Sequence, residues 1–237
     1  MALDMVTEAA AEYGVRLTAE QEVQFDRYLL LLQEASRRMN LVSDASDESV
    51  QRRHFLESIA LGAALRERQL LRPGASVLDV GAGAGFPGAV LKIVWPSIAL
   101  TLIEATAKKA DFLRELAAAL GLDMAVRTGR AETLGHDADL RERFDLVLAR
   151  AVAPLPVLLE LTLPFARVGG HVVTPKGSRA WEELAAAARA LEVLGGRAFA
   201  FPLRVAGPAQ TIVAIAKTAA TPEVYPRRPG VPGRSPL

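Results

Sequence analysis

The spacing of apolar residues follows the period of an α-helix over the first part of the chain. Thr18 and Gln21 have the spacing of a capping box, and the helix that they begin is expected to end near Arg37. A second helix is predicted from about Asp47 to Leu70, because apolar residues recur there on one helical face. The pattern therefore predicts an N-terminal helical cap over residues 1–71.

The pattern changes at Ser76, where short β-rich runs begin to alternate with helical runs. Strands are predicted at 76–80, 98–104, 124–128, 144–149 and 169–175, and helices at 108–120, 156–166 and 179–194. Such alternation is typical of βαβ units, which form a parallel sheet covered by helices. Two further strands, 197–205 and 210–217, follow each other with only a short turn between them, which predicts an antiparallel pair at one sheet edge. We therefore expect an α/β domain over residues 72–217.

The last part of the chain, residues 218–237, has no such pattern. Five prolines stand among the 17 residues from Thr221 onward, and the segment is predicted to be a flexible Pro/Arg-rich tail. Its Tyr225, Arg227 and Arg228 could stack on bases and contact phosphate, or simply be solvated.

Composition narrows the classes of protein that remain. The chain has 237 residues, of which 51% are apolar and 23% charged, with a net charge of +1, so disorder of the whole chain is excluded. Cysteine is absent, which excludes a thiolate nucleophile and disulfides. His136 and His171 have no partners at metal spacing, so we predict no metal site. No apolar run is long enough to span a membrane, and the start is acidic, so a cytoplasmic protein without membrane association is expected.

The strongest chemical signal is the run VLDVGAGAGFPG at residues 77–88, where a predicted strand enters a glycine-rich turn. Gly83, Gly85 and Gly88 form G-x-G-x-x-G with an acid, Glu104, 21 residues after the first glycine, which is the dinucleotide pattern of an NAD-dependent oxidoreductase. Asp79 extends the run to D-x-G-x-G-x-G. A carboxylate would repel a diphosphate, whereas it attracts the cationic groups of S-adenosylmethionine by about 4 kcal/mol at 4 Å and an effective dielectric of about 20. Charge thus favours a methyl donor, with the oxidoreductase as the alternative.

Further candidate residues follow the next strands, at the edge where an open α/β sheet binds its ligand. Glu104 could accept hydrogen bonds from ribose hydroxyls, with Ala105 and Thr106 beside the adenosine, or could be a surface carboxylate paired with Lys108. After the third strand, Ala131 and Glu132 could contact the adenine edge or belong to an ordinary loop.

Basic residues follow the later strands at the same edge. Arg150 ends the fourth strand, where it would be a ligand clamp or a surface charge. Lys176 and Arg179 follow the fifth strand, where they could meet phosphates or be solvated charges at a helix start.

Four segments in order, RHFLES, DVGAGAGFPG, FDLVLARAVAPLPVLLE and GGHVVTPKG, resemble the ribosomal RNA small subunit methyltransferase G family, also called glucose-inhibited division protein B. The resemblance covers about residues 35–215. It implies a Rossmann-like class I S-adenosylmethionine-dependent methyltransferase sheet and methyl transfer to N7 of one guanosine of 16S ribosomal RNA near the decoding centre. The RNA would be recognised either free, in the 30S subunit or in an assembly intermediate, by a protein expected to be monomeric.

The resemblance also implies which positions bind the cofactor: Gly81, Phe86, Glu104, Ala105, Thr106, Ala131, Glu132 and Arg150. The sequence departs from the family at two positions, since Glu104 stands where many members have Asp and Ala149 where Ser is frequent. His54, in the HFLES segment, becomes a candidate RNA contact beside Lys176 and Arg179, although a histidine on a helix is also a common structural residue.

The expected chemistry requires little from the protein beyond placement of the reactants. N7 of guanine has a free lone pair and no proton to lose, so no catalytic base is assigned and positioning should dominate, with Arg150 as a candidate for it. A methyltransferase acting on small-molecule nitrogen and a non-catalytic RNA-binding module are compatible with the same residues.

Overall fold

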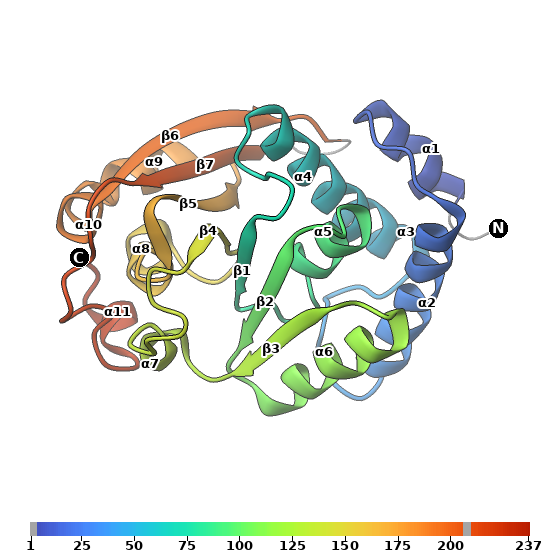
Figure 1. The fold of residues 1–237 in the computed structure, drawn as a ribbon, viewed down its shortest axis with the longest axis horizontal. Coiled ribbons are helices and arrows are strands. Elements are labelled where there is room, and N and C mark those ends of the chain that lie inside the picture. The colour runs from blue at the N-terminus through green and yellow to red at the C-terminus, as the bar shows by residue number, and fades with distance from the viewer. Residues whose placement is uncertain (1–3, 206–209) are drawn as a thin grey trace.

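The computed structural model describes residues 4–205 and 210–237, and its centre is a seven-stranded sheet (Figure 1). The strands are β1 Ser76–Val80, β2 Ala99–Glu104, β3 Met124–Thr128, β4 Phe144–Leu148, β5 Ala166–Lys176, β6 Gly196–Leu203 and β7 Gln210–Lys217. Their order is β3-β2-β1-β4-β5-β7-β6, with β1 to β5 parallel and β7 antiparallel to both β5 and β6. The predicted mostly parallel sheet with an antiparallel pair at its edge is confirmed; the predicted turn at 206–209 lies outside the described residues.

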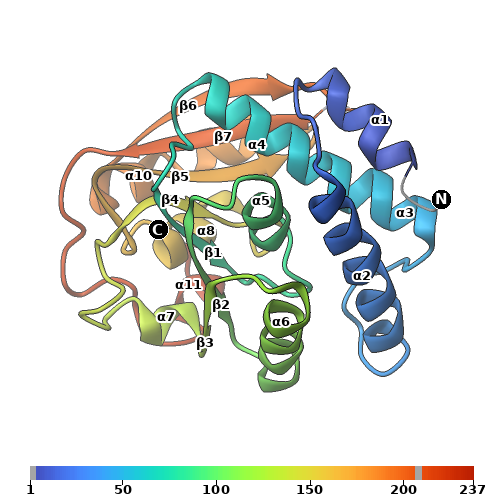
Figure 2. The ribbon, with the colours of Figure 1, turned by 45° about the vertical axis from the view of Figure 1, so that its right-hand side comes forward.

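The N-terminal helices cover one face of the sheet together with the two helices that follow β1 and β2. They are α1 Asp4–Glu12, α2 Ala19–Ser36, α3 Asp47–Val50, α4 Glu57–Glu67, α5 Gly88–Val94 and α6 Ala107–Leu120. The capping box at Thr18 is present. The second predicted helix begins at Asp47, but its middle, Gln51–Leu56, is a π-helical stretch, η1. Figure 2 shows α2 lying along the outside of this group, next to α6.

The remaining helices gather on the other side of the molecule (Figure 1). They are α7 Ala131–Leu134, α8 Leu155–Thr162, α9 Ala180–Ala186, α10 Ala188–Leu194 and α11 Val231–Arg234. The helix predicted at 156–166 is therefore shorter than expected, and the one predicted at 179–194 is divided at Ala187.

Two hydrophobic cores, one on each face of the sheet, place the central strand β1 between them. Val77 packs in the core shared with the N-terminal helices, and Leu78 and Val80 in the core shared with α8 and α10. Because side chains alternate along a strand, Asp79 points to the same side as Val77. It is paired in register with Leu102 of β2 and Leu148 of β4, so its carboxylate lies in the interior of the protein.

The C-terminal segment, residues 218–237, differs from the predicted flexible tail because it packs against the domain. Thr221 is buried, and Arg141 donates to the carbonyl oxygens of Thr221 and Tyr225, both at 2.8 Å. Arg227 forms an ion pair with the buried Glu160 of α8, so it is not a solvated side chain of a flexible tail. The composition of this segment predicted flexibility, but contacts with residues far away in the sequence hold the segment in place.

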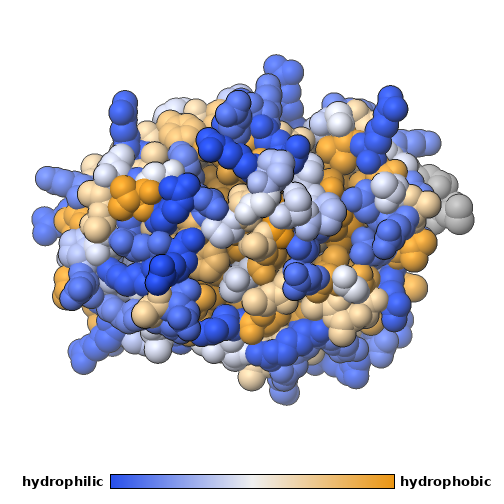
Figure 3. Space-filling view, in the orientation of Figure 1, coloured by the Kyte–Doolittle hydropathy of each residue, from blue (hydrophilic) through white to orange (hydrophobic). Residues whose placement is uncertain are grey.

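One face of the surface carries both hydrophilic and apolar side chains. Hydrophilic side chains protrude around the outline of the face in Figure 3, with apolar patches between them. Over residues 4–205 and 210–237, no helix has both the length and the apolar character needed to cross a membrane.

Candidate functional site

The glycine-rich turn joins β1 to α5 at the carboxyl edge of the sheet. Gly81, Gly83 and Gly85 have φ angles of +73°, +55° and +97°, which L side chains rarely adopt. A Cβ on Gly85 would also lie 2.5 Å from the phenol oxygen of Tyr28. The glycines are therefore required both by the turn's backbone and by the close approach of α2.

Asp79 lies beneath this turn and is fully buried. Its Oδ2 accepts a hydrogen bond from the Gly88 amide at 2.9 Å, at the start of α5. Its Oδ1 is buried and has no hydrogen-bond partner among the described residues. Burial raises the pKa of Asp79 to about 7, although the Gly88 amide and the charge of Arg150 oppose the rise. One oxygen thus stabilises the turn, and the other is an unused acceptor.

Glu104, at the end of β2, holds the same turn from the neighbouring strand. Its Oε2 accepts from the Gly83 amide at 3.0 Å and its Oε1 from the Thr106 amide at 2.8 Å. The side chain is buried, so the alternative of a surface carboxylate paired with Lys108 is wrong.

Three stacked rings connect the N-terminal helical segment to the turn. Phe86 lies between Tyr28 of α2 and His54 of η1, with ring centroids at 5.3 and 4.7 Å and nearly parallel planes. The Tyr28 hydroxyl donates to the Ala84 carbonyl oxygen at 2.6 Å. Burial, reinforced by nearby arginines, lowers the pKa of His54 to about 4, so its ring is neutral at pH 7. Phe86 and His54 are thus parts of a packed stack.

Arg150 extends from the loop after β4 toward the same helical segment. Its Nη2 donates to the Arg53 carbonyl oxygen and to Nδ1 of His54, both at 2.8 Å, and its Nη1 lies 3.5 Å from Glu57. Only 21% of its side chain is exposed, which argues against a simple surface charge. It fixes the loop after β4 against η1.

The two basic residues after β5 differ in their surroundings. Lys176 donates to the Ala153 carbonyl oxygen at 3.0 Å and to Glu183 at 2.8 Å, and its side chain is largely covered. Arg179, which precedes α9, is exposed. Of the three predicted RNA contacts, Arg179 is the exposed one, whereas His54 and Lys176 are held by partners inside the protein.

A cavity of about 310 Å³ opens beside the turn, at the carboxyl ends of β1, β2 and β3. It brings together four of the predicted cofactor residues: Gly81, Ala105, Ala131 and Glu132. Val80, Ile103 and Val152 add apolar surface. Phe86, Glu104, Thr106 and Arg150 are not in the lining, and of these Phe86, Glu104 and Thr106 make or receive the contacts that hold the turn in place.

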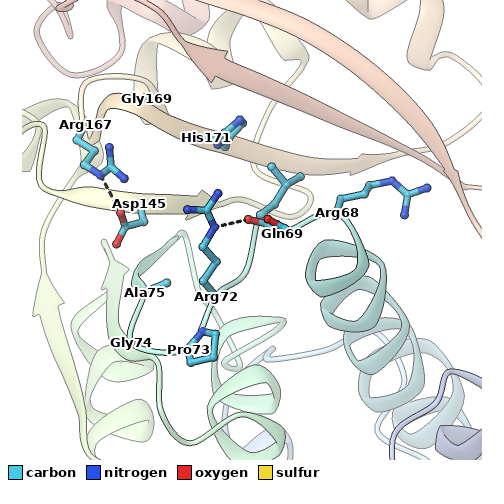
Figure 4. A pocket seen from close by; sticks show the side chains of 11 residues that line it. Arg68, Gln69, Arg72, Pro73, Gly74, Ala75, Asp145, Arg167, Gly169 and His171 are labelled. Carbon is cyan, nitrogen blue, oxygen red and sulfur yellow. Dashed lines mark hydrogen bonds and ion pairs between the residues drawn. The ribbon is translucent and has the colours of Figure 1, made fainter.

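A larger cavity, of about 490 Å³, lies at the opposite edge of the sheet, near the amino ends of β1, β4 and β5 (Figure 4). Arg68, Arg72 and Arg167 surround it, and Arg167 is paired with Asp145 at 2.7 Å. Ligands of open α/β sheets bind at the carboxyl ends of the strands, so the smaller cavity beside the glycine turn is the better candidate site.

Several residues of the site were missed by the sequence analysis. Tyr28 lies within the first predicted long helix and carried no functional prediction, although its hydroxyl donates to the Ala84 carbonyl oxygen in the turn. Val152 meets the turn closely, 2.9 Å from where a Cβ on Gly81 would lie. Gly230, Pro232 and Gly233 line the cavity from the C-terminal segment, where the high proline content predicted a flexible tail rather than part of a site.

Solved structures of methyltransferases share this fold. A precorrin-6y C5,15-methyltransferase from Geobacter metallireducens aligns with a TM-score of 0.52 and 17% identity, covering 69% of this chain and 88% of its own. A ribosomal protein L11 methylase from Lactobacillus delbrueckii subsp. bulgaricus has a TM-score of 0.50 and 22% identity, covering 73% and 80%. The sheet differs from the dinucleotide order 3-2-1-4-5-6 by the antiparallel β7 between β5 and β6. The fold is therefore a Rossmann-like α/β fold, which these solved methyltransferases share.

Sequence relationships narrow the class to one family. The family model described as rRNA small subunit methyltransferase G matches residues 21–212. Relatives described as ribosomal RNA small subunit methyltransferase G are 43% identical in Pelotomaculum thermopropionicum, over 99% of this chain and 98% of theirs, and 42% identical in Deinococcus radiodurans, over 99% and 92%. The chain belongs to the rRNA small subunit methyltransferase G family. The predicted family and methyltransferase activity are confirmed, and the oxidoreductase alternative is wrong.

Proposed function

We propose that this protein transfers a methyl group from S-adenosylmethionine to N7 of one guanosine of 16S ribosomal RNA. The observation that carries the proposal is the cavity beside the glycine turn, whose lining combines Gly81, Ala105, Ala131 and Glu132 in a member of this family. The RNA is recognised free, in the 30S subunit or in an assembly intermediate.

The residues present fit this cofactor. The backbone of Gly81 lies at the cavity without a side chain, and the apolar Val80, Ile103 and Val157 suit the faces of a flat heterocycle. Glu132 and Arg130 supply polar groups at the same cavity. The Oδ1 of Asp79, under the turn, is an acceptor without a partner among the described residues. A cationic ligand near it would favour the ionised form of the Asp79 carboxyl group.

When bound, S-adenosylmethionine supplies an electrophilic methyl group on a positively charged sulfur. Because N7 of guanine has a lone pair and no proton, the chain needs no general base. Its residues instead hold two reactants in place, and such positioning accounts for a large part of a reaction barrier. Glu104 and Asp79 accept hydrogen bonds from the amides of Gly83 and Gly88, so side chains of the protein itself hold the turn on the cofactor side of the site.

We further propose that the helical segment over residues 1–71 acts as a cap on this site. The stack of Tyr28, Phe86 and His54 supports this role, as does the contact of Arg150 with the Arg53 carbonyl oxygen. The exposed Arg179, on the loop after β5, is proposed to contact RNA phosphate.

Methyl transfer is tested with the purified full chain, tritiated S-adenosylmethionine and 16S rRNA, offered both free and as 30S subunits from cells lacking the modification. We expect label in one guanosine, recovered as 7-methylguanine after digestion. Glu104→Ala is the matched inactive variant, since it removes the acceptor for two turn amides. Label in another base, or binding of the RNA without any transfer, would contradict the proposal.

A further inference from the structure

The C-terminal segment forms one wall of the cavity beside the glycine turn. Gly230, Pro232 and Gly233 line it together with Gly81 and Ala105, which are about 125 to 150 residues away in the sequence. The wall is made of backbone and a proline ring, so it adds a surface without charge. Nothing else in the described C-terminal segment lines this cavity.

A buried ion pair outside the cavity holds this wall. Glu160 of α8 is fully buried, and its Oε1 accepts from the Arg227 backbone amide at 2.8 Å and from Arg227 Nε at 2.9 Å. Its Oε2 accepts from Arg227 Nη2 at 2.6 Å, and the same Nη2 donates to the Ser235 carbonyl oxygen at 2.8 Å. The guanidinium therefore fixes the chain on both sides of the lining residues.

A second contact joins the wall directly to a predicted cofactor residue. The Gly230 amide donates to Oε1 of Glu132 at 3.2 Å, and Arg130 Nη2 donates to the same oxygen at 2.9 Å. Glu132 is buried, so its orientation depends on both donors. Displacement of the C-terminal segment would change the cavity wall and the position of Glu132 together.

We infer that residues 230–233 are part of the methyl-donor site and that they recognise its nucleoside end, with Arg227 as the positioning residue that acts through them. The inference rests on the proposed function. At about 310 Å³ the cavity is at the small end of ligand sites, which suits one part of the donor. The cavity has apolar faces, and its two charged side chains, Glu132 and Arg130, already form an ion pair with each other. An amino acid would need free partners for its ammonium and carboxylate groups, so a purine nucleoside is the better match.

Gly233 gives a direct test of the wall. A Cβ there meets no other atom within 4 Å, and its φ is not in the left-handed region, so Gly233→Val should fold normally while it takes up cavity space. Gly177→Val is the matched control, because a Cβ on Gly177 also meets nothing and the residue does not line the cavity. Binding of S-adenosylhomocysteine is measured by calorimetry, and that of 5′-methylthioadenosine by displacement.

We expect Gly233→Val to weaken both ligands by the same factor, at least about ten-fold or 1.4 kcal/mol, with the melting temperature of the free protein unchanged. Gly177→Val should bind as wild type does. Unchanged affinity in Gly233→Val would overturn the inference. Weaker binding of S-adenosylhomocysteine with unchanged 5′-methylthioadenosine would overturn the assignment to the nucleoside end.

Arg227 is tested with Arg227→Lys and with the double variant Glu160→Met/Arg227→Met, which removes both charges and so avoids leaving one buried alone. The double variant should weaken both ligands several-fold, and Arg227→Lys less, since a lysine keeps one contact. Wild-type affinity in the double variant would overturn the positioning role.

If wild-type protein failed to bind S-adenosylhomocysteine, the proposed function itself would fail, whereas equal binding by wild type and variants would refute only the C-terminal contribution.

Discussion

Two carboxylates near the site, those of Glu160 and Asp79, are both fully buried but differ in how their oxygens are hydrogen-bonded. Glu160 uses both oxygens on one arginine, and the pair closes the C-terminal segment onto α8. Asp79 uses one oxygen on the Gly88 amide and leaves the other without a partner among the described residues. Removal of one partner from a satisfied buried pair leaves an uncompensated charge and destabilises the fold. A buried acceptor without a partner already costs free energy, and a ligand that pairs with it would recover that cost.

The largest expected effect breaks the satisfied pair. Arg227→Met leaves Glu160 buried without a counter-charge, and the free energy of unfolding should fall by about 3–5 kcal/mol. Replacement of both residues by Met should restore most of it. Denaturant unfolding of the two variants and wild type measures the difference. A loss under about 1 kcal/mol in the single variant would show that the pair is solvated, as surface pairs are.

The next effect concerns the carboxylate that holds the turn from β2. Glu104→Ala removes the acceptor for the part-buried amides of Gly83 and Thr106, at a cost of about 1 kcal/mol each. S-adenosylhomocysteine binding should be lost with it, because the turn is no longer fixed. Calorimetry measures the binding of S-adenosylhomocysteine, and urea unfolding measures the loss of stability. Glu104→Gln keeps one acceptor oxygen, so its stability and its affinity should lie between those of wild type and Glu104→Ala. If the two variants behaved identically, the hydrogen bonds of Glu104 would not be what holds the turn.

Asp79 should make stability depend on pH in a direction opposite to most carboxylates. Burial raises its pKa to about 7 from an ordinary 3.8, so the folded protein holds the proton more tightly than the unfolded chain. Its contribution is therefore complete below pH 3.8 and is lost as the pH rises through about 7, by up to about 1.4 kcal/mol per pH unit.

The measurement is the difference in unfolding free energy between wild type and Asp79→Asn from pH 5 to 8. The asparagine keeps an acceptor for the Gly88 amide, so the two proteins differ mainly in the titrating group. Wild type should lose stability relative to the variant as the pH rises. A constant difference across this range would contradict a raised pKa.

The smallest effect is expected from the hydroxyl that ties α2 to the turn. Tyr28→Phe keeps the stack on Phe86 but removes the hydrogen bond to the Ala84 carbonyl oxygen, which should lower the unfolding free energy by about 1 kcal/mol. Tyr225→Phe is the control, because the Tyr225 hydroxyl makes no hydrogen bond to a described residue. Equal effects of the two substitutions would show that the Tyr28 hydroxyl does not hold the turn.

Local patterns were enough to predict most of the sheet and its ligand edge. Strand β7 has the predicted bounds, Gln210–Lys217, and the glycine turn follows β1 as its spacing indicated. Alternation and glycine spacing are properties of neighbouring residues, so they can be read from the sequence without knowledge of the tertiary contacts. The π-helical stretch at Gln51–Leu56 was missed because a single turn with i→i+5 hydrogen bonds is too short to stand out in the apolar pattern of the surrounding helix.

The sequence by itself determined the α/β architecture, the position of the glycine turn and the family to which the chain belongs. Only the tertiary structure decided which side chains hold the turn, that His54 is stacked and neutral, and that Gly230 to Gly233 line the cavity. The reason is that a helix or a turn depends on residues a few positions apart. The partners of Tyr28, Glu132 and Arg227 lie 56, 98 and 67 positions away, and chain folding alone brings them together.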